Sequence, residues 1–537
     1  MKRFTQLCAF ALTIILFGGC GADSGSQQSA GNSGNQSEEE RFTGYPLDTD
    51  ETISIWCSAP GGRITALHSS YTSYDESPFH IGLEEMTGVK VDWRAPAAGT
   101  DQTQAFNLML NSDTLPDIIC WDLFSVAPQY IEEKIIRDLT EEMPLYAPNY
   151  WALLQENEHY DKSMKTDDGQ YYGFGSFRES TWSATYIGPV IRKDWLEEQN
   201  LSVPETMDDW DKVLRTFKDA YNAQFSFAMS RINPGFASGF NAYTSFRPTI
   251  YVDDDQKVQF AMAQLEWKEY MAQLHQWYVD EIIDPDSVTL DDAGVRTKVI
   301  NEKVGASVTA MGQITNWVND AEASGSDADW SGAPYPVQNK GDIPCSIQGE
   351  DTVAVVEAAV TTSCPDEKLE TVLRWLDYGY SEEGYMYWNY GKEGQCYTMV
   401  DGVPTYTDLL TKDPEGLNAV LAKYVGTTGR GLAVQAENMV RQKNVPVAVE
   451  AVDIWTSENR WSEHQYPDGC SQTAGESAEV SSIYSPISTY AEEMALKFLT
   501  GEESLDNFDA FIARLDSMNL KRYLEIQQAA YDRFITR

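Results

Sequence analysis

The 537-residue sequence has few side chains suited to metal or nucleophilic chemistry. It contains five histidines, and neither a C-x-x-C nor an H-E-x-x-H spacing occurs, so a zinc site has no support. A G-x-S-x-G element, a P-loop and a G-x-G-x-x-G after a strand are also missing. Paired carboxylates serve glycosidases, but with 83 acidic residues some pairing is inevitable, and nothing sets two carboxyl groups across a bond. We therefore expect a binding protein and not an enzyme.

Basic residues are scarce as well. The 39 Lys and Arg stand against 83 Asp and Glu, which gives a formal net charge of −44. This balance argues against nucleic acid or an anionic membrane surface as a partner. After the N-terminal segment no apolar run is long enough to span a bilayer.

Cysteine usage does not require disulfides. Two of the eight cysteines, Cys8 and Cys20, lie at the N-terminus. The others are scattered at positions 57, 120, 345, 364, 396 and 470. A chain of this size can build cores without covalent staples, so their pairing stays open.

The N-terminus has the layout of a secretory signal. Lys2 and Arg3 precede an apolar stretch from Phe4 to Phe17, and two glycines lead to Cys20. The apolar stretch is too short for a transmembrane helix of the mature protein. The order resembles the bacterial lipoprotein signal, in which the cysteine is lipidated and becomes the first residue. Ordinary secretion with an incidental Cys20 is the alternative.

A polar tether follows the expected lipidation site. Residues 21–40 are mostly Gly, Ser, Asn, Gln and Glu, a composition with no apolar surface to bury. A coil of this length spans about 25 Å, enough to hold a folded body away from a membrane. Loss of Lys2 and Arg3 with residues 1–19 makes the charge of the mature chain −46. We expect a cell-surface protein, lipid-anchored to the outer face of a bacterial cytoplasmic membrane.

The first part of the folded body alternates strand and helix patterns. Strands are expected over 52–57, 89–93 and 117–122, and helices over 77–88 and 103–116. This order predicts a parallel sheet with helices on its faces. Ligands bind at the carboxyl ends of such strands, where this chain has Trp56, Trp121 and Asp122.

Further units follow. Thr206 and Asp209 have capping-box spacing, and Trp210, Val213 and Phe217 then continue an apolar helical stripe. A strand is expected from residue 184, a helix over 266–283, a strand near 305–314 and two helices over 504–534.

Several stretches together resemble a known family. In chain order they are "LEEMTGVKVDW", "NLMLNSDTLPDII", "DGQYYGF", "PVIRKDWLEEQNLSVPETMDDWDKVLRTFKD", "QWYVDEIIDPD", "YSEEGYMYWNYGKEGQCY" and the C-terminal "FLTGEESLDNFDAFIARLDSMNLKRYLEIQQAAYDRF". They resemble the solute-binding lipoproteins of carbohydrate ABC importers, in the oligosaccharide-binding branch of the maltose-binding-like group.

The resemblance implies an α/β clamshell whose two lobes are mainly parallel sheets flanked by helices, with three chain crossings at the hinge. The expected organisation is a signal peptide at 1–19, a tether at 20–49, lobe 1 at 50–176 and 328–380, and lobe 2 at 177–327 and 381–537. It also implies a monomer that binds an oligosaccharide between the lobes and passes it to the permease subunits of an ABC importer. A lipoprotein that senses another solute and signals to a membrane partner is the alternative.

Sugars present flat apolar faces and rims of hydroxyl groups, so their sites combine aromatic rings with charged or amide groups. We selected such residues from expected strand ends and loops. The candidate ligand-binding residues are Trp56, Trp121, Asp122, Arg178, Trp182, Arg247, Gln313, Trp317, Trp388, Tyr390 and Glu393.

Alternatives for these residues stay open. Asp122 either caps a helix or accepts sugar hydroxyls, and the tryptophans either bind ligand or pack in a core. The motif around Trp388 and Tyr390 is equally consistent with a structural role. Arginines are few in the set and aromatic rings many, so a neutral ligand is expected.

Neither a metal nor another cofactor is expected. Many members of the resembled group carry a calcium loop of EF-hand type after the "VLRTFKD" position. This chain continues with "AYNAQFSF", which lacks the required spacing of acidic residues.

The N-terminal pattern makes a first testable prediction. Cys20→Ala should release the protein from the membrane fraction or leave it unprocessed, because the lipid acceptor is lost. Fractionation with an antibody against the folded body measures this, and Cys8→Ala in the apolar segment is the matched control. Full membrane retention of a correctly cleaved Cys20→Ala protein contradicts lipidation.

Overall fold

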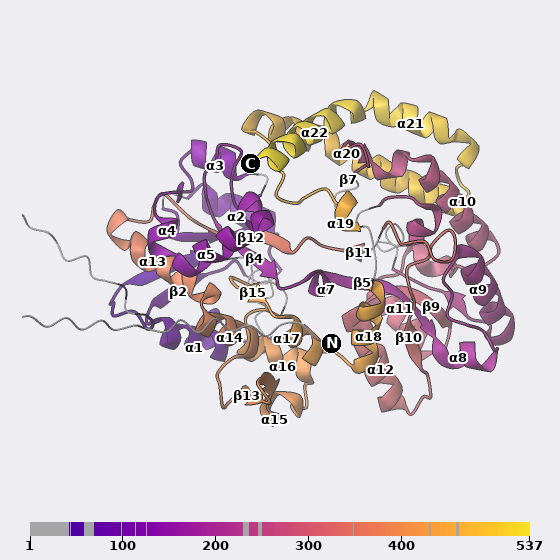
Figure 1. The fold of residues 1–537 in the computed structure, drawn as a ribbon, viewed down its shortest axis with the longest axis horizontal. Coiled ribbons are helices and arrows are strands. Elements are labelled where there is room, and N and C mark those ends of the chain that lie inside the picture. Colours follow the sequence, from indigo (N-terminus) through magenta and orange to yellow (C-terminus); the bar gives the residue numbers. More distant parts are fainter. Residues whose placement is uncertain are drawn as a thin grey trace, which may run out of the picture. The chain divides into compact units, whose positions relative to one another are not determined.

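Six strands form the first sheet, in the order β15-β4-β12-β3-β1-β2. Figure 1 labels β2, β4, β12 and β15 of this sheet. Their bounds are β1 Thr52–Trp56, β2 Lys90–Arg94, β3 Ile118–Cys120, β4 Phe174–Arg178, β12 Val353–Val360 and β15 Val434–Gln435. β1 pairs in parallel with both β2 and β3. Helices α1, Pro78–Thr87, and α2, Gln102–Leu110, connect these three strands. The predicted strand and helix alternation is therefore confirmed here.

The computed structural model describes residues 42, 44–57, 69–97, 99–112, 114–124, 126–228, 236–244, 250–346, 348–428, 431–457 and 461–537. The expected signal peptide, Cys20 and most of the tether lie outside these residues, as does the candidate Arg247.

β12 joins the first sheet with the opposite direction. It pairs antiparallel with β3 on one side and with β4 on the other. Ala358 lies opposite both Cys120 and Phe174, and Val353 lies opposite Phe177. The sheet is thus mixed, and its middle is completed by a strand about 180 residues downstream of β4.

The second sheet has the order β10-β5-β9-β6, and β11 pairs with β5 outside this path. The bounds are β5 Thr185–Arg192, β6 Gln224–Phe225, β9 Val304–Ala310, β10 Trp330–Gly332 and β11 Gln348–Gly349. β5 is antiparallel to β9, β10 and β11, whereas β6 is parallel to β9. Two hairpins complete the strands, β7 Ile250–Val252 with β8 Val258–Phe260 and β13 Tyr397–Val400 with β14 Val403–Tyr406.

Helix α9, Met207–Tyr221, begins at the predicted capping box. The Thr206 hydroxyl accepts from the Asp209 backbone N–H, and the Asp209 carboxylate accepts from the Thr206 N–H. Trp210 and Phe217 on its apolar stripe are buried. The local sequence therefore sets both the start of this helix and the face that it buries.

The other helices surround the two sheets (Figure 1). They are α3 Ala127–Glu132, α4 Met143–Tyr146, α5 Pro148–Glu156, α6 Glu158–Ser163, α7 Thr181–Ala184, α8 Lys193–Glu198, α10 Leu265–Val279, α11 Asp292–Ile300, α12 Met311–Ser324, α13 Leu369–Asp377, α14 Glu382–Tyr390, α15 Asp408–Thr411, α16 Leu417–Tyr424, α17 Glu437–Gln442, α18 Pro446–Trp455, α19 Trp461–His464, α20 Ala474–Thr500, α21 Phe508–Ser517 and α22 Leu520–Thr536. The two predicted C-terminal helices are α21 and α22. Among the described helices, none has the length and apolar composition needed to cross a membrane.

The pairings of three strands differ from the expected lobe boundaries: β11, at Gln348–Gly349 in the range expected for lobe 1, pairs with β5 of the second sheet, and two further strands differ as well. β10 lies within 328–380, expected in lobe 1, but pairs with β5 of the second sheet. β15 lies within 381–537, expected in lobe 2, but pairs with β4 of the first sheet. Short edge strands join a sheet through long-range pairing that local patterns do not encode. The division into lobes itself stays a prediction.

An ionic contact links the C-terminal helix to the loop before β4. Asp167 in this loop accepts hydrogen bonds from the guanidinium groups of Arg533 and Arg537. Arg537 also donates to the carbonyls of Lys162 and Lys165, at 2.8 and 2.6 Å. Its side chain is only 3% exposed, so this charge is buried but fully partnered.

The six described cysteines, at positions 57, 120, 345, 364, 396 and 470, are all buried, and no disulfide bond joins any two of them. The described core is thus held by packing and hydrogen bonds, as its size allows.

The buried carboxyl group of Asp377 makes the stability of the fold depend on pH. This carboxylate is fully buried at the end of α13 and accepts from the Tyr150 backbone N–H at 2.8 Å and from Asn149 Nδ2 at 2.6 Å. Burial raises its pKa to about 6, although those hydrogen bonds oppose the rise. Because the folded-state pKa lies above the unfolded one, the stabilising contribution is complete below about pH 4 and is lost as pH rises through 6.

Asp377→Asn should remove this pH dependence. The variant can keep its hydrogen bonds, because Asn149 can rotate its side-chain amide to pair with the amide introduced at position 377. We expect the stability of the variant relative to wild type to rise by about 2 kcal/mol between pH 4 and pH 7. Urea unfolding across this range measures the difference. Asp408→Asn, at an exposed site, is the control. A difference that stays constant with pH contradicts the prediction.

Candidate functional site

A network of polar side chains lies at the carboxyl ends of β4 and β15. Arg178, the last residue of β4, donates from Nη1 to Gln435 Oε1 at 2.8 Å and from Nη2 to Glu350 Oε2 at 2.6 Å. Tyr186 donates its hydroxyl to the other oxygen of Glu350 at 2.9 Å. Four residues from four segments are thereby held in one network.

Strand pairing explains why these residues meet. β15 runs parallel to β4 with Gln435 beside Arg178, so both side chains stand at the same edge of the sheet. Thr352 lies directly before β12, and its carbonyl accepts a hydrogen bond from the Arg178 backbone N–H at 2.8 Å. This contact brings Glu350, two residues earlier, to the guanidinium group.

A cavity of about 300 Å³ adjoins this network. It is lined by His159, Thr181, Glu350, Asp351, Thr352, Gln465 and Pro467. His159 Nε2 lies 2.5 Å from Asp351 Oδ1. Burial lowers the pKa of His159, but the hydrogen bond and charge of Asp351 outweigh it and the net pKa is raised. The lining offers hydroxyl, carboxylate and amide groups, and its volume is at the lower end for small-molecule sites.

Trp182 lies on the short helix between β4 and β5. Ser180 caps this helix through a capping box with Ser183. Trp182 Nε1 donates to Asp453 Oδ1 at 2.8 Å, and the Arg441 guanidinium lies 3.9 Å from the ring centre. One face of the indole is thus covered by a cation, a favourable cation–π arrangement.

Three aromatic rings cluster at the ends of β1 and β3. Trp121 stacks on Phe106 with ring centres 4.3 Å apart and planes 7° apart, and Trp56 lies 5.5 Å from Phe106. Trp56 is buried, whereas Trp121 is partly exposed. Asp122 is partly exposed and lies near Tyr172, whose pKa is raised by burial and, to a smaller degree, by this carboxylate.

Three candidate aromatics lie in the cores. Trp317 is 1% exposed and packs 5.0 Å from Trp330. Trp388 packs against Phe79, and Tyr390 packs between Tyr397 and Tyr406. In this conformation none of the three presents an open ring face.

Two polar candidates lie apart from the network. Gln313 is partly exposed on α12 and accepts from Asn316 at 3.3 Å. Glu393 is exposed just after α14. The structure therefore brings Arg178 and Trp182 together on one segment, and Trp56 with Trp121, but does not gather the whole candidate set.

The sequence prediction missed several residues of the network. Glu350 and Asp351 precede β12, Glu437 is the first residue of α17, Lys443 directly follows that helix, and His159 lies on α6. Single acidic residues are too common in this chain to stand out. These residues could have been found by their position beside strand ends. That would have required β12 and β15 to be recognised as strands in the sequence.

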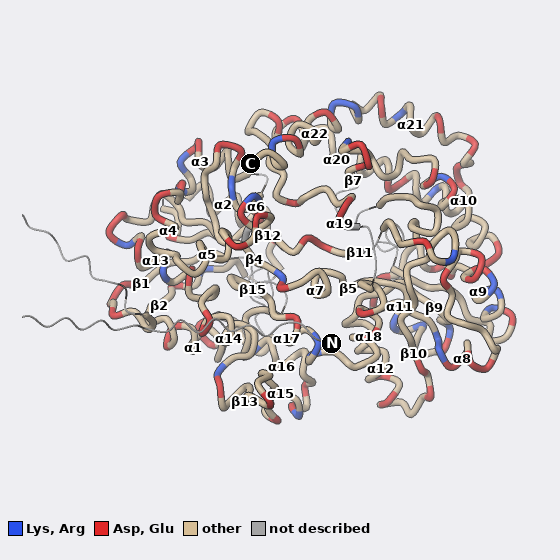
Figure 2. The backbone as a smooth tube through the Cα atoms, in the orientation of Figure 1, with Lys and Arg blue, Asp and Glu red and all other residues tan. Residues whose placement is uncertain are grey.

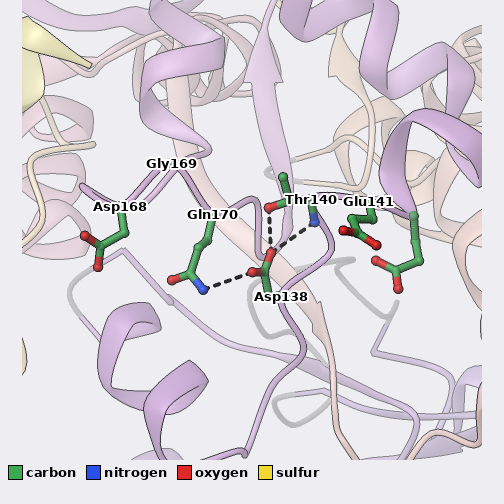
Figure 3. A pocket seen from close by; sticks show the side chains of 7 residues that line it. Asp138, Thr140, Glu141, Asp168, Gly169 and Gln170 are labelled. Carbon is green, nitrogen blue, oxygen red and sulfur yellow. Dashed lines mark hydrogen bonds between the residues drawn. The ribbon is translucent and has the colours of Figure 1, made fainter.

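A second hollow, of about 430 Å³, lies between the loop before α4 and the turn before β4 (Figure 3). Its lining residues are Asp138, Thr140, Glu141, Glu142, Asp168, Gly169 and Gln170. Figure 3 shows Thr140 and Gln170 bonded to Asp138, with a Gln170 Nε2 to Asp138 Oδ2 distance of 2.9 Å. It lacks an aromatic platform. No group of His, Cys, Asp and Glu in the described part of the chain has an arrangement that holds a metal ion.

The sequence matches the model of the bacterial extracellular solute-binding proteins over residues 73–386. The chain belongs to this family. Its members bind solutes and are not enzymes, which confirms the expectation from the sequence.

Two curated relatives are informative. The fructooligosaccharide ABC transporter substrate-binding protein FusA of Streptococcus pneumoniae is 29% identical over 245 residues, 42% of this chain and 45% of FusA. The lipoprotein LipO of Bacillus subtilis is 25% identical over 368 residues, 65% of this chain and 70% of LipO. The chain thus aligns with less than half of FusA.

Solved structures share the fold. The alginate-binding protein AlgQ2, in its calcium-free form, matches with a TM-score of 0.73 at 22% identity, over 91% of this chain and all of that one. A solute-binding protein of Bifidobacterium longum subsp. infantis matches with a TM-score of 0.72 at 15% identity, over 90% and 98%. The expected α/β fold of periplasmic-binding-protein type is confirmed by these matches, whereas the three hinge crossings stay a prediction. The expectation that both sheets are mainly parallel was wrong for the second sheet, because β5 pairs antiparallel with β9, β10 and β11, and strand direction depends on long-range pairing.

The pair formed by Arg178 and Glu350 should be strongly coupled. Their side chains are 12% and 22% exposed, so removing either partner leaves a poorly solvated charge. We expect Arg178→Met and Glu350→Gln each to lower the free energy of unfolding by about 2 to 4 kcal/mol. The loss in the double variant should be smaller than the sum of the two single losses by at least about 1 kcal/mol. Urea unfolding of all four proteins completes the cycle.

The exposed pair Lys412 and Asp408 is the control, and its coupling should be only about 0.3–0.5 kcal/mol. Equal coupling energies for the two pairs contradict the prediction that the pair of Arg178 and Glu350 is strongly coupled.

Proposed function

We propose that this protein is an extracellular receptor that binds an oligosaccharide and delivers it to the permease of an ABC importer. The observation that carries the proposal is the joint position of Arg178, Glu350 and Trp182 at strand ends beside a polar cavity. Sugars require such a mixture of charge-assisted hydrogen bonds and aromatic surface. Family membership and the carbohydrate relatives support the same conclusion.

Two parts of the proposal concern arrangement in the cell. Closure of two lobes on the ligand would present a new surface to the permease, as in other hinged binding proteins. A lipid on Cys20 and the tether would keep the receptor beside that permease. The relative LipO carries the name lipoprotein, which supports this part.

We further propose that the ligand is neutral. Arg178 is already paired with Glu350, and Arg441 with Glu437 and Asp453, at 2.7 and 2.9 Å. A polyanion would have to replace these carboxylates and approach a chain with a net charge of −44 (Figure 2). Hydroxyl groups can use the same network without displacing charge.

A panel of neutral oligosaccharides tests this proposal. It contains fructo-, malto-, cello- and galacto-oligosaccharides, with uronic-acid oligomers of matched length as the comparison. We expect thermal stabilisation by a neutral member, since ligand at 100 times Kd adds about 2.7 kcal/mol. Calorimetry from about 20 to 500 mM salt, over which the Debye length falls from roughly 20 to 4 Å, should give nearly constant affinity because the proposed ligand carries no charge.

Two results contradict parts of the proposal. Micromolar binding of an acidic oligomer, with no binding of any neutral one, contradicts the assignment of a neutral ligand. Binding without uptake in cells, together with a signalling response, favours the sensing lipoprotein over the import receptor.

A further inference from the structure

We propose that Lys443 is a ligand-binding residue, and that its ammonium group, Arg178 Nε and Thr428 Oγ1 together donate hydrogen bonds to oxygen atoms of the sugar. This inference rests on the proposed function and names donors within its site.

Lys443 differs from other partly buried lysines of this chain. Lys165 pairs with Asp161, Lys298 with Asp284 and Lys368 with Asp117. Within the described residues, Lys443 forms no ion pair, and its Nζ has a single hydrogen-bond partner, the Thr428 carbonyl at 3.0 Å. An ammonium carries three donors, so two remain available.

Two neighbouring groups also lack partners. Arg178 Nε and Thr428 Oγ1 are buried atoms without a hydrogen-bond partner in the described structure. Burying a polar atom without a partner is costly, and such atoms are rare in native structures. An oxygen-rich ligand would satisfy all three groups at once.

The position of Lys443 fits this role. It directly follows α17, and its Nζ contacts the Thr428 carbonyl at 3.0 Å. Gln435 Nε2 donates to the Thr427 carbonyl at 2.7 Å and so holds the loop that Lys443 contacts. Arg178 also donates to Gln435. The donors are therefore fixed by the network already described.

The electrostatics are consistent with a missing acceptor. Desolvation, and to a smaller degree the charge of Arg178, lowers the pKa of Lys443 to about 8. A ligand oxygen that accepts from the ammonium stabilises its charged form, so the pKa in the complex must be higher. Affinity should then be constant below pH 7.5 and fall as pH rises above 8.

Other charged groups near Lys443 are accounted for. The Arg178 guanidinium is paired with Glu350. Glu437 and Arg441 on α17 are paired with each other. His159 titrates in the adjoining cavity, so the informative quantity is the difference between wild type and variant.

The experiment compares Lys443→Met and Lys443→Arg with wild type. The probe is the neutral panel member that gives the largest thermal stabilisation of the wild type. We expect Lys443→Met to weaken its calorimetric affinity at least tenfold at pH 7, and Lys443→Arg to retain more of it. Without ligand, Tm of Lys443→Met should be unchanged or higher, since a desolvated charge is removed.

The pH profile separates binding from structure. From pH 7 to 9.5 the wild-type affinity should fall several-fold more than that of Lys443→Met. Lys392→Met, at an exposed lysine beside Glu85, is the matched control and should match wild type.

A structural role of Lys443 at the end of α17 predicts a lower Tm with unchanged affinity, and that result overturns the inference alone. A panel without any binder overturns the proposed function and this inference with it.

Discussion

The insertion of β12 between β3 and β4 is the constraint on which the candidate site depends. Its antiparallel register places Val353 opposite Phe177, so the residues just before it meet the end of β4. As a result, Glu350 reaches Arg178 and Asp351 reaches His159. Both contacts join residues more than 170 positions apart. A slip of one residue would turn these side chains to the other face and leave Arg178 without its carboxylate.

Local signals predicted much of the fold. The β1, β2 and β3 unit, the capped helix α9 and the C-terminal helices follow from periodicity, capping residues and helix-ending glycines such as Gly88, whose φ is 75°. The antiparallel direction of β12 and the pairings of β10 and β15 could not be predicted in this way. They depend on contacts between distant segments, and a short strand has the same local pattern in either sheet.

The site was predicted in part. Arg178 and Trp182 were selected because they follow the "DGQYYGF" stretch near the expected first crossing between the lobes. For Trp388 and Tyr390 the sequence left ligand binding and packing equally open: "YWNYG" has a loop-like glycine, but in the structure it is the end of α14, which stops at Gly391 with φ of 75°. Trp388 instead packs against Phe79. Lys443 has no sequence signal, since what distinguishes it is that none of the described carboxylates pairs with it in the folded chain.

Charge pairing shapes what this acidic protein can recognise. Carboxylates are abundant, so the guanidinium groups of Arg178, Arg441 and Arg537 are all neutralised internally. Each pairing also fixes a side chain that would otherwise be mobile, which lowers the entropy lost when a ligand binds. The groups with unused hydrogen-bonding capacity are donors, and these ion pairs already hold their neighbours in place. Such a preorganised surface suits a ligand that supplies acceptor oxygens without adding charge, because no internal ion pair has to break for it to bind.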